Sequence, residues 1–138
     1  MAEPTQPAMV LSVADLTPHV RQLVLLPKTQ TIPFQPGQWV SLQLPVGTKP
    51  PLNRAYSLAE PPSPTGQLTL VFDQVPDGTG SHYLYGLKPG DELLLSGPYG
   101  SFLLPSPLDR ELLLISRYTG LVPIRCMLKQ LAAAGPMP

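Results

Sequence analysis

The sequence predicts a mainly β fold: a six-stranded antiparallel Greek-key barrel with one short helix, followed by a strand and a helix near the C-terminal end. Three observations predict it. Short runs of β-branched and aliphatic residues recur along the chain, and most of the connections between them contain turn residues. The 20 prolines stand between these runs rather than inside them. This pattern favours a closed antiparallel barrel over a parallel α/β sheet.

Six segments are expected to form the barrel strands. The first two are separated by Thr17-Pro18, where proline interrupts the run and favours a turn. The third follows a Pro-Gly turn signal and alternates, which places Val40, Leu42 and Leu44 on one face. The six expected strands are 9–16, 20–26, 39–44, 54–58, 67–75 and 91–96.

Two helices are expected. Ser81 is placed to cap a short helix over 82–87. Further on, 112–115 is a continuous apolar run, typical of a strand buried on both faces, and 123–134 is an amphipathic helix that ends before Gly135. Strand, glycine-containing turn and helix form the opening of a nucleotide-binding α/β unit. The chain is therefore divided into a barrel domain, 1–108, and the truncated start of a nucleotide-binding domain, 109–138.

Composition argues against several classes of protein. The formal net charge is +0 and no basic stripe occurs, so nucleic acid is not expected as a partner. No apolar run approaches the roughly 20 residues that cross a bilayer, and no signal peptide is recognisable, so we expect a cytoplasmic protein without membrane contact. The single cysteine, Cys126, cannot form an internal disulfide, and its place in the helix predicts a small buried side chain. No metal site is predicted.

Two motifs carry the candidate chemistry. In the segment 54–57, strand alternation places Arg54 and Tyr56 on one face and Ala55 on the other. Arginine offers planar donors suited to phosphate, and tyrosine offers a flat surface for a ring. In 78–81, small residues let the backbone approach an anion at a helix N-terminus. Each motif alone also has a simpler interpretation. The segment 54–57 fits an exposed arginine beside a core tyrosine, and 78–81 fits a capped helix without a ligand.

Six motifs in order resemble the flavin domain of the ferredoxin-NADP reductase superfamily, and the resemblance covers nearly the full chain. They are Phe34-Gln35-Pro36-Gly37-Gln38-Trp39-Val40, Arg54-Ala55-Tyr56-Ser57, Gly78-Thr79-Gly80-Ser81 followed by Tyr83-Leu84, Leu87-Lys88-Pro89-Gly90-Asp91, Gly97-Pro98-Tyr99-Gly100-Ser101-Phe102 and Thr119-Gly120-Leu121-Val122-Pro123-Ile124.

The resemblance implies a barrel that carries FAD. It places Arg54 on a phosphate, Tyr56 against the flavin and Ser57 near the flavin nitrogen that accepts hydride, which makes Ser57 and Tyr56 the catalytic candidates. It implies further cofactor contacts from Ala55, Val71, Phe72, Asp73, Gly78, Thr79, Gly80, Ser81 and Thr119. Alternation should turn Ser57 away from Arg54 and Tyr56, unless its backbone N–H or a strand bend brings it round.

The resemblance implies an oxidoreductase that passes electrons between a nicotinamide nucleotide and a redox partner. One motif departs from the family pattern. Where the related enzymes have a Gly-Gly-Thr-Gly turn, this chain has Arg117-Tyr118-Thr119-Gly120. A backbone that needs positive φ accommodates glycine readily and a bulky residue poorly, and the added side chains occupy space that a dinucleotide would use. The alternative is a flavin-binding electron-transfer or interaction module without its own NAD(P)H site. A third interpretation is a barrel that binds no flavin.

The end of the chain leaves two interpretations open: a piece of a longer reductase, or a complete protein that has lost the nicotinamide half. Within 123–134, the apolar positions need a partner surface, and no further strands follow to provide one. We therefore expect a homodimer formed through this helix. The apolar positions are Ile124, Met127, Leu128 and Leu131.

Overall fold

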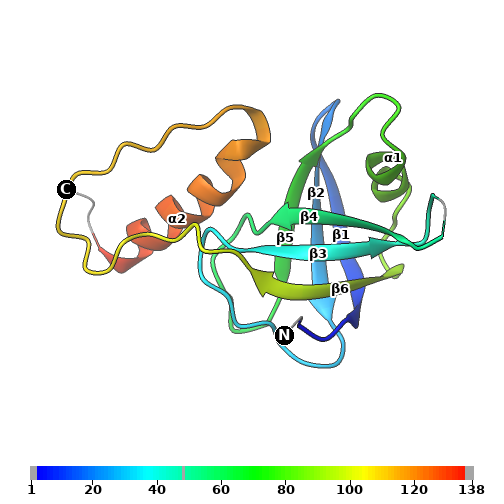
Figure 1. Cartoon of the computed structure of the whole chain (residues 1–138), viewed down its shortest axis with the longest axis horizontal. Coiled ribbons are helices and arrows are strands. Elements are labelled where there is room, and N and C mark those ends of the chain that lie inside the picture. Colours follow the sequence, from blue (N-terminus) through cyan, green and yellow to red (C-terminus); the bar gives the residue numbers. More distant parts are fainter. Residues whose placement is uncertain (1–2, 48, 136–138) are drawn as a thin grey trace.

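The computed structural model describes residues 3–47 and 49–135 and contains one antiparallel sheet with two helices (Figure 1). The strands are β1 Gln6–Thr17, β2 Val20–Pro27, β3 Trp39–Leu44, β4 Leu52–Ser57, β5 Leu68–Asp73 and β6 Glu92–Tyr99. The helices are α1 Thr79–Tyr85 and α2 Leu121–Ala134, and a 3₁₀ turn, η1 Tyr118–Gly120, leads into α2. The mainly β class predicted from the sequence is confirmed.

The strand order is β4-β3-β6-β1-β2-β5, so β6 is inserted between β3 and β1 as a Greek-key connection requires. A bridge between Leu58 and Leu70 brings the end of β4 to β5. Beside it, the Ala59 N–H donates to the Thr69 carbonyl at 2.8 Å. The two outer strands of the sheet therefore meet at one end, and this contact closes the barrel there.

The core follows from strand alternation. On β3, the predicted inward residues Val40, Leu42 and Leu44 are fully buried, and alternate residues of β1, β2, β5 and β6 are buried with them. Burying an aliphatic side chain of this size contributes about 1.5–3 kcal/mol. The buried residues of the other strands are Ala8, Val10, Leu23, Leu25, Leu68, Leu70, Phe72, Leu93 and Leu95.

The prediction for the first helix is wrong at its start. Helix α1 begins at Thr79, and Gly78 rather than Ser81 occupies its N-cap position. Ser81 lies in the first turn, where its hydroxyl accepts the Val75 N–H at 3.1 Å and donates to the Gly78 carbonyl at 3.0 Å. The hydroxyl braces the preceding loop, so it does not cap a later helix.

The predicted strand at 112–115 is also wrong, since these residues have no regular secondary structure. Leu113 and Ile115 are 86% and 81% exposed. An apolar run forms a strand only beside another strand that takes up its backbone hydrogen bonds, and the described residues place none there. The segment instead loops past α2 (Figure 1). The division at residue 108 stays a prediction, and the outer ends of both segments, 1–2 and 136–138, lie outside the described residues.

Helix α2 begins two residues before the predicted start and ends, as predicted, at Ala134, just before Gly135. It packs on the barrel, where Ile124, Cys126 and Met127 are buried. This burial corrects part of the expectation for the helix, because Ile124 and Met127 are covered within the chain, Met127 beside Gly37. Leu128 remains 38% exposed, and the homodimer stays a prediction. Neither helix of the described chain is long and apolar enough to cross a bilayer.

Candidate functional site

The candidate site lies along the seam between β4 and β5. Strand β4 pairs with β3 on one side. On its other side, backbone pairing with β5 in the described residues is confined to the end of β4, at the Leu58–Leu70 bridge and the adjacent Ala59–Thr69 hydrogen bond. Edge strands present unpaired backbone N–H and C=O groups. The seam therefore opens away from this bridge and offers hydrogen-bonding backbone along the 54–57 motif.

Arg54 and Tyr56 share a face, as strand alternation predicts. Arg54 is paired with Leu42 and Tyr56 with Val40, and directly opposed residues project to the same side of a sheet. Tyr56 is partly buried against the core, whereas Arg54 is exposed at the barrel mouth. One Arg54 N–H group donates to the neighbouring Asn53 carbonyl at 2.9 Å. The other N–H groups of its guanidinium are suited to binding an anion at this end of the seam.

Ala55 and Ser57 lie on the opposite face. They are paired with Ser41 and Trp39, and the register between β3 and β4 runs without a bulge. No strand bend turns the Ser57 side chain toward Tyr56. A ligand bound along the edge of β4 would nevertheless lie beside side chains from both faces of the strand. The backbone of Ser57 lies along the same seam.

Tyr56 is held as a neutral ring. Its ring centroid is 5.6 Å from that of Phe72 on β5, at an interplanar angle of 63°. Burial raises the pKa of the Tyr56 hydroxyl above its ordinary 10.0, and Asp73 adds to the rise while Arg54 opposes it. The hydroxyl therefore stays protonated throughout the physiological pH range. Both charged groups are themselves predicted site residues.

The segment 78–81 brings the N-terminus of α1 to Arg54. A Cβ at Gly80 would lie 3.5 Å from Arg54 Cγ, so helix and arginine are neighbours. A Cβ at Gly78 would lie 2.9 Å from Val75 Cβ, which only glycine avoids. The first amides of a helix have no partner within it, and no side chain caps them here. The N-terminus of α1 and the Arg54 side chain thus lie next to each other at one end of the seam, with Thr79 exposed beside them.

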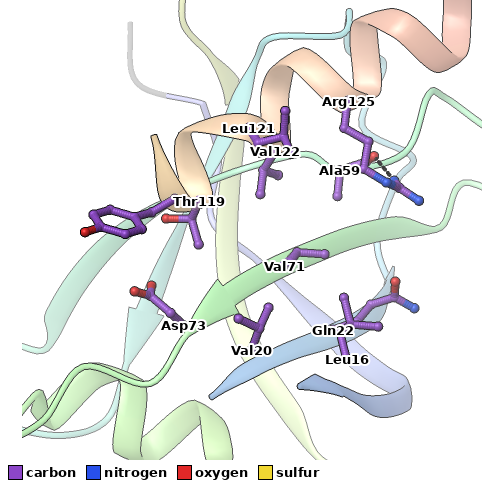
Figure 2. A pocket seen from close by; sticks show the side chains of 11 residues that line it. Leu16, Val20, Gln22, Ala59, Val71, Asp73, Thr119, Leu121, Val122 and Arg125 are labelled. Carbon is purple, nitrogen blue, oxygen red and sulfur yellow. Dashed lines mark hydrogen bonds between the residues drawn. The ribbon is translucent and has the colours of Figure 1, made fainter. Parts of the chain in front are cut away.

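A cavity of about 480 Å³ lies over the outer face of β5, beneath the start of α2 (Figure 2). It brings Val71, Asp73 and Thr119 together, although Thr119 is distant in sequence. Phe72 lies on the other face of β5 against Tyr56. The predicted residues therefore form two groups, one on each side of this strand. Asp73 lines the cavity and also raises the pKa of Tyr56 on the other side.

Sequence reasoning missed part of this cavity. Val20 and Gln22 line it because β2 pairs with β5, which sets Val20 opposite Asp73 and Gln22 opposite Val71. No local motif marks such a register. Leu16, near the end of β1, also lines it. Arg125 also lines the cavity and donates to the Ala59 carbonyl at 2.7 Å (Figure 2). From the sequence, the position of Arg125 in the amphipathic helix predicts only that it is partly exposed, and does not predict that it lines a cavity.

Tyr118 stands at the mouth of the cavity in an uncommon backbone conformation. Its φ is 52° and it is 77% exposed. A non-glycine residue in this left-handed region costs about 1–2 kcal/mol. The Arg117 guanidinium lies 4.5 Å from the centre of the Tyr118 ring. A large side chain thus occupies a left-handed position that glycine adopts more readily.

The remaining reactive groups offer no further site. Cys126 is buried, and burial raises the pKa of its thiol to about 11, so the thiol stays protonated and unreactive. In the part of the chain that the structure describes, no three His, Cys, Asp or Glu side chains cluster as metal ligands.

Comparison with known proteins gives a consistent result. Residues 8–103 match the family model of the oxidoreductase FAD-binding domain. The chain is 36% identical over 135 residues to ferredoxin–NADP reductase B of Sorangium cellulosum, covering 97% of this chain and 54% of that protein. It is 33% identical over 131 residues to the phenol hydroxylase P5 protein of Acinetobacter pittii, covering 93% of this chain and 35% of that protein.

Among solved structures, the cytochrome P450 reductase GcoB of Amycolatopsis superposes with a TM-score of 0.78 at 31% identity. That match covers 96% of this chain and 41% of the reductase. The chain thus spans about half, or less, of the length of the proteins it matches.

Proposed function

The chain belongs to the family of oxidoreductase FAD-binding domains, within the ferredoxin-NADP reductase superfamily, and from this we propose that it holds FAD in the β4–β5 seam and passes electrons between a nicotinamide nucleotide and a redox partner. The observation that carries the proposal is the seam itself. Arg54 and the α1 N-terminus meet at one end, and the Tyr56 ring lies farther along the same strand edge. This arrangement matches the two parts of a flavin nucleotide, an anionic pyrophosphate and a flat ring.

At the phosphate end, Arg54 and the amides of 78–81 would hold the pyrophosphate. Their proximity supports this assignment, as does the steric need for glycine at Gly78. An exposed guanidinium and an uncapped helix N-terminus are each favourable to an anion, and together they add charge-assisted hydrogen bonds. The residues present fit the group chemically.

At the ring end, Tyr56 would lie against the flavin and Ser57 would contact its reactive edge. Tyr56 is neutral and partly buried, which suits a stacking surface. Ser57 reaches the seam through its backbone, and its hydroxyl borders the opposite face. Ala55, Val71, Phe72 and Asp73 would add contacts from the two strands, and Thr119 would approach from η1.

FAD, when bound, supplies the electron-transfer chemistry of such a site. The chain's own residues bind and orient it, and the buried side of the seam excludes water from one face. Several relatives are described as reductase or electron-transfer components, among them the toluate 1,2-dioxygenase electron transfer component of Pseudomonas putida. A protein partner as electron acceptor is proposed on this basis.

A second candidate function is a flavin-binding module without its own NAD(P)H site. The observation that favours it is Tyr118, an exposed ring in a strained conformation at the cavity mouth. The region 109–138, which we propose as the start of a nucleotide-binding domain, would then leave the nicotinamide nucleotide no room beside η1.

Titration of the purified chain with FAD tests the first proposal. We expect saturable quenching of flavin fluorescence, since tyrosine lies against the ring. Arg54→Gln should raise the Kd for FAD about 10- to 100-fold, because a hydrogen bond to a charged group contributes about 1.5–3 kcal/mol. Arg110→Gln, which alters an exposed arginine paired with Asp109, is the matched control. No saturable binding by the parent chain contradicts the proposal.

Anaerobic mixing of the FAD-loaded chain with NADH or NADPH separates the two candidates. Rapid loss of the flavin absorption band supports the reductase. A band that persists in the parent chain but bleaches in Tyr118→Gly supports the module, because removal of the ring would open the cavity mouth. Equal rates in both chains would exclude Tyr118 as the obstacle.

A further inference from the structure

A row of five side chains crosses the barrel behind the ring end of the seam. We call Asp15, Arg21, Tyr85, Phe72 and Tyr56 the ring row. Arg21 on β2 is paired with Asp15 on β1 and with Phe72 on β5. Directly opposed residues share a face, so three neighbouring strands place these side chains side by side. Tyr85 comes from α1 and Tyr56 from β4, so the row spans both sides of the open seam.

Arg21 is fixed by its hydrogen bonds. Its Nε and Nη2 donate to the two carboxylate oxygens of Asp15, at 2.7 and 3.1 Å. Its Nη1 donates to the carbonyl oxygen of Tyr85, the last residue of α1. Helix C-termini leave carbonyls without an internal partner and favour a cation. The Arg21 side chain is only 16% exposed, and these hydrogen bonds fix its guanidinium between Asp15 and the end of α1.

The rings follow in sequence from that guanidinium. Arg21 Cζ lies 4.4 Å from the centre of the Tyr85 ring. The Tyr85 ring meets the Phe72 ring edge-to-face, with centroids 5.6 Å apart at 85°. Phe72 meets Tyr56 at the same centroid distance, at 63°. Each ring limits the orientations of the next, since aromatic pairs prefer such edge-to-face geometry.

We propose that Arg21 is a positioning residue for the cofactor site, which acts through Tyr85 and Phe72 to set the angle of the Tyr56 ring. The inference rests on the proposed function, in which Tyr56 lies against the flavin. Space filling alone does not require a guanidinium at this position, because an aliphatic side chain would fill the barrel end without the cost of partly burying a charge. A fixed cation above Tyr85 does more than fill space, since it orients the ring and holds the end of α1.

The test is a double-mutant cycle on FAD binding. Arg21→Met keeps the apolar length of the side chain and removes the guanidinium. We expect it to raise the Kd for FAD about tenfold and to lengthen the fluorescence lifetime of bound FAD, because Tyr56 quenches less from a loosened angle. In a Tyr56→Leu background the same substitution should change the Kd less than about twofold, since no ring remains to be positioned.

Two further variants keep the test decisive if Arg21→Met does not fold. Tyr85→Phe keeps the ring and removes a buried hydroxyl that has no hydrogen-bond partner among the described residues, so binding should match the parent. Tyr85→Leu removes the ring and leaves Arg21 in place, and it should reproduce the loss of affinity. Arg21→Lys, which keeps the charge but not the planar stacking, should restore only part of the affinity.

The outcomes separate this inference from the function on which it rests. A parent chain that does not bind FAD contradicts the proposed function, and this inference with it. A parent chain that binds FAD, but in which Arg21→Met costs the same affinity with and without Tyr56, contradicts the positioning role alone. An unchanged lifetime of bound FAD in both Arg21→Met and Tyr85→Leu does so as well.

Discussion

The two sides of β5 are built in different ways. On the seam side, the β3–β4 ladder fixes Arg54 and Tyr56, and the Ser81 hydroxyl fixes the 78–81 segment at the start of α1. On the cavity side, Thr119 and Tyr118 belong to a single 3₁₀ turn that leads directly into α2. The seam is therefore a property of the barrel, whereas the cavity exists only while α2 is docked.

Helix α2 is attached by buried apolar residues and by a small set of polar contacts. Arg125 donates to Ala59 and, at 2.6 Å, to Glu60, and Lys129 also pairs with Glu60. Met127 packs where the 34–40 motif turns, close to Gly37. The difference between the sides teaches that flavin binding and access to the flavin can be altered separately. Perturbing the barrel should affect the first, and perturbing α2 should affect the second.

The largest effect is expected at Gly37, where barrel and α2 meet. A Cβ there would lie 1.8 Å from the Phe102 carbonyl oxygen and 2.6 Å from Met127 Cε, and its φ is +104°. Gly37→Ala should therefore lower the free energy of unfolding by about 3 kcal/mol or more, from backbone overlap and left-handed strain together. Chemical denaturation measures the loss.

Gly90→Ala is the control for Gly37. Gly90 has a similar φ of +93°, but a Cβ there would have no atom within 4 Å. Only the backbone strain applies, so the loss should be about 1 kcal/mol. Equal losses in the two variants would contradict the tight junction between the turn and α2.

Much of the barrel could be predicted from sequence because its signals are local. The alternation of Val40, Leu42 and Leu44 marks the strand between two turns, and these three residues are buried. The pairing of Arg54 and Tyr56 on one face follows from the same period. Strand ends were less accurate, as β6 extends to Tyr99 beyond the predicted 96.

The errors arise where a contact that the local sequence pattern does not show decides the structure. Ser81 fits an N-cap by composition, yet its hydroxyl is taken by Val75 and Gly78. The run 112–115 has the composition of a buried strand but no strand beside it in the described chain. The cavity depends on the register between β2 and β5, which no local pattern sets. The preceding loop decides the role of Ser81, and tertiary pairing decides the other two features.

A smaller effect is expected at the phosphate end of the seam. A Cβ at Gly78 would lie 3.0 Å from the backbone oxygen of Val75, which cannot move without shifting the loop. At Gly80 the nearest atom is the flexible end of Leu44, at 3.3 Å. Gly78→Ala should raise the Kd for FAD about tenfold, since 1–3 kcal/mol of overpacking displaces the helix amides.

Gly80→Ala is the matched variant within the same motif. Alanine favours a helix over glycine by about 1 kcal/mol, so the fold should be as stable as the parent or more so. The Kd for FAD should change by no more than about twofold. If both alanine variants bind FAD like the parent, the 78–81 amides do not hold the pyrophosphate.

The smallest effect is a pH dependence of the free energy of unfolding, which we expect from the cavity side of β5 and not from the seam side. Burial raises the pKa of the Glu60 carboxyl, but the hydrogen bonds from Lys129 and Arg125 outweigh it, so the pKa lies below its ordinary 4.5. A carboxyl with a lowered folded-state pKa stabilises the fold above its unfolded value and loses that contribution as the pH falls through the folded value. Below pH 4.5 the attachment of α2 should therefore weaken progressively.

Glu60→Gln tests this difference between the two sides. At pH 7 it should lower the free energy of unfolding by about 1 kcal/mol, the usual upper range for a partly exposed ion pair. The gap from the parent should close as the pH is lowered below 4.5, because both chains then carry a neutral side chain. Asp109→Asn, at an exposed pair with Arg110, should show almost no gap at any pH.

At pH 7 the Kd of Glu60→Gln for FAD should match that of the parent, because the barrel alone holds the seam. A gap that is independent of pH, or a loss of FAD affinity comparable to that of Gly78→Ala, would show that α2 and the seam are not separate.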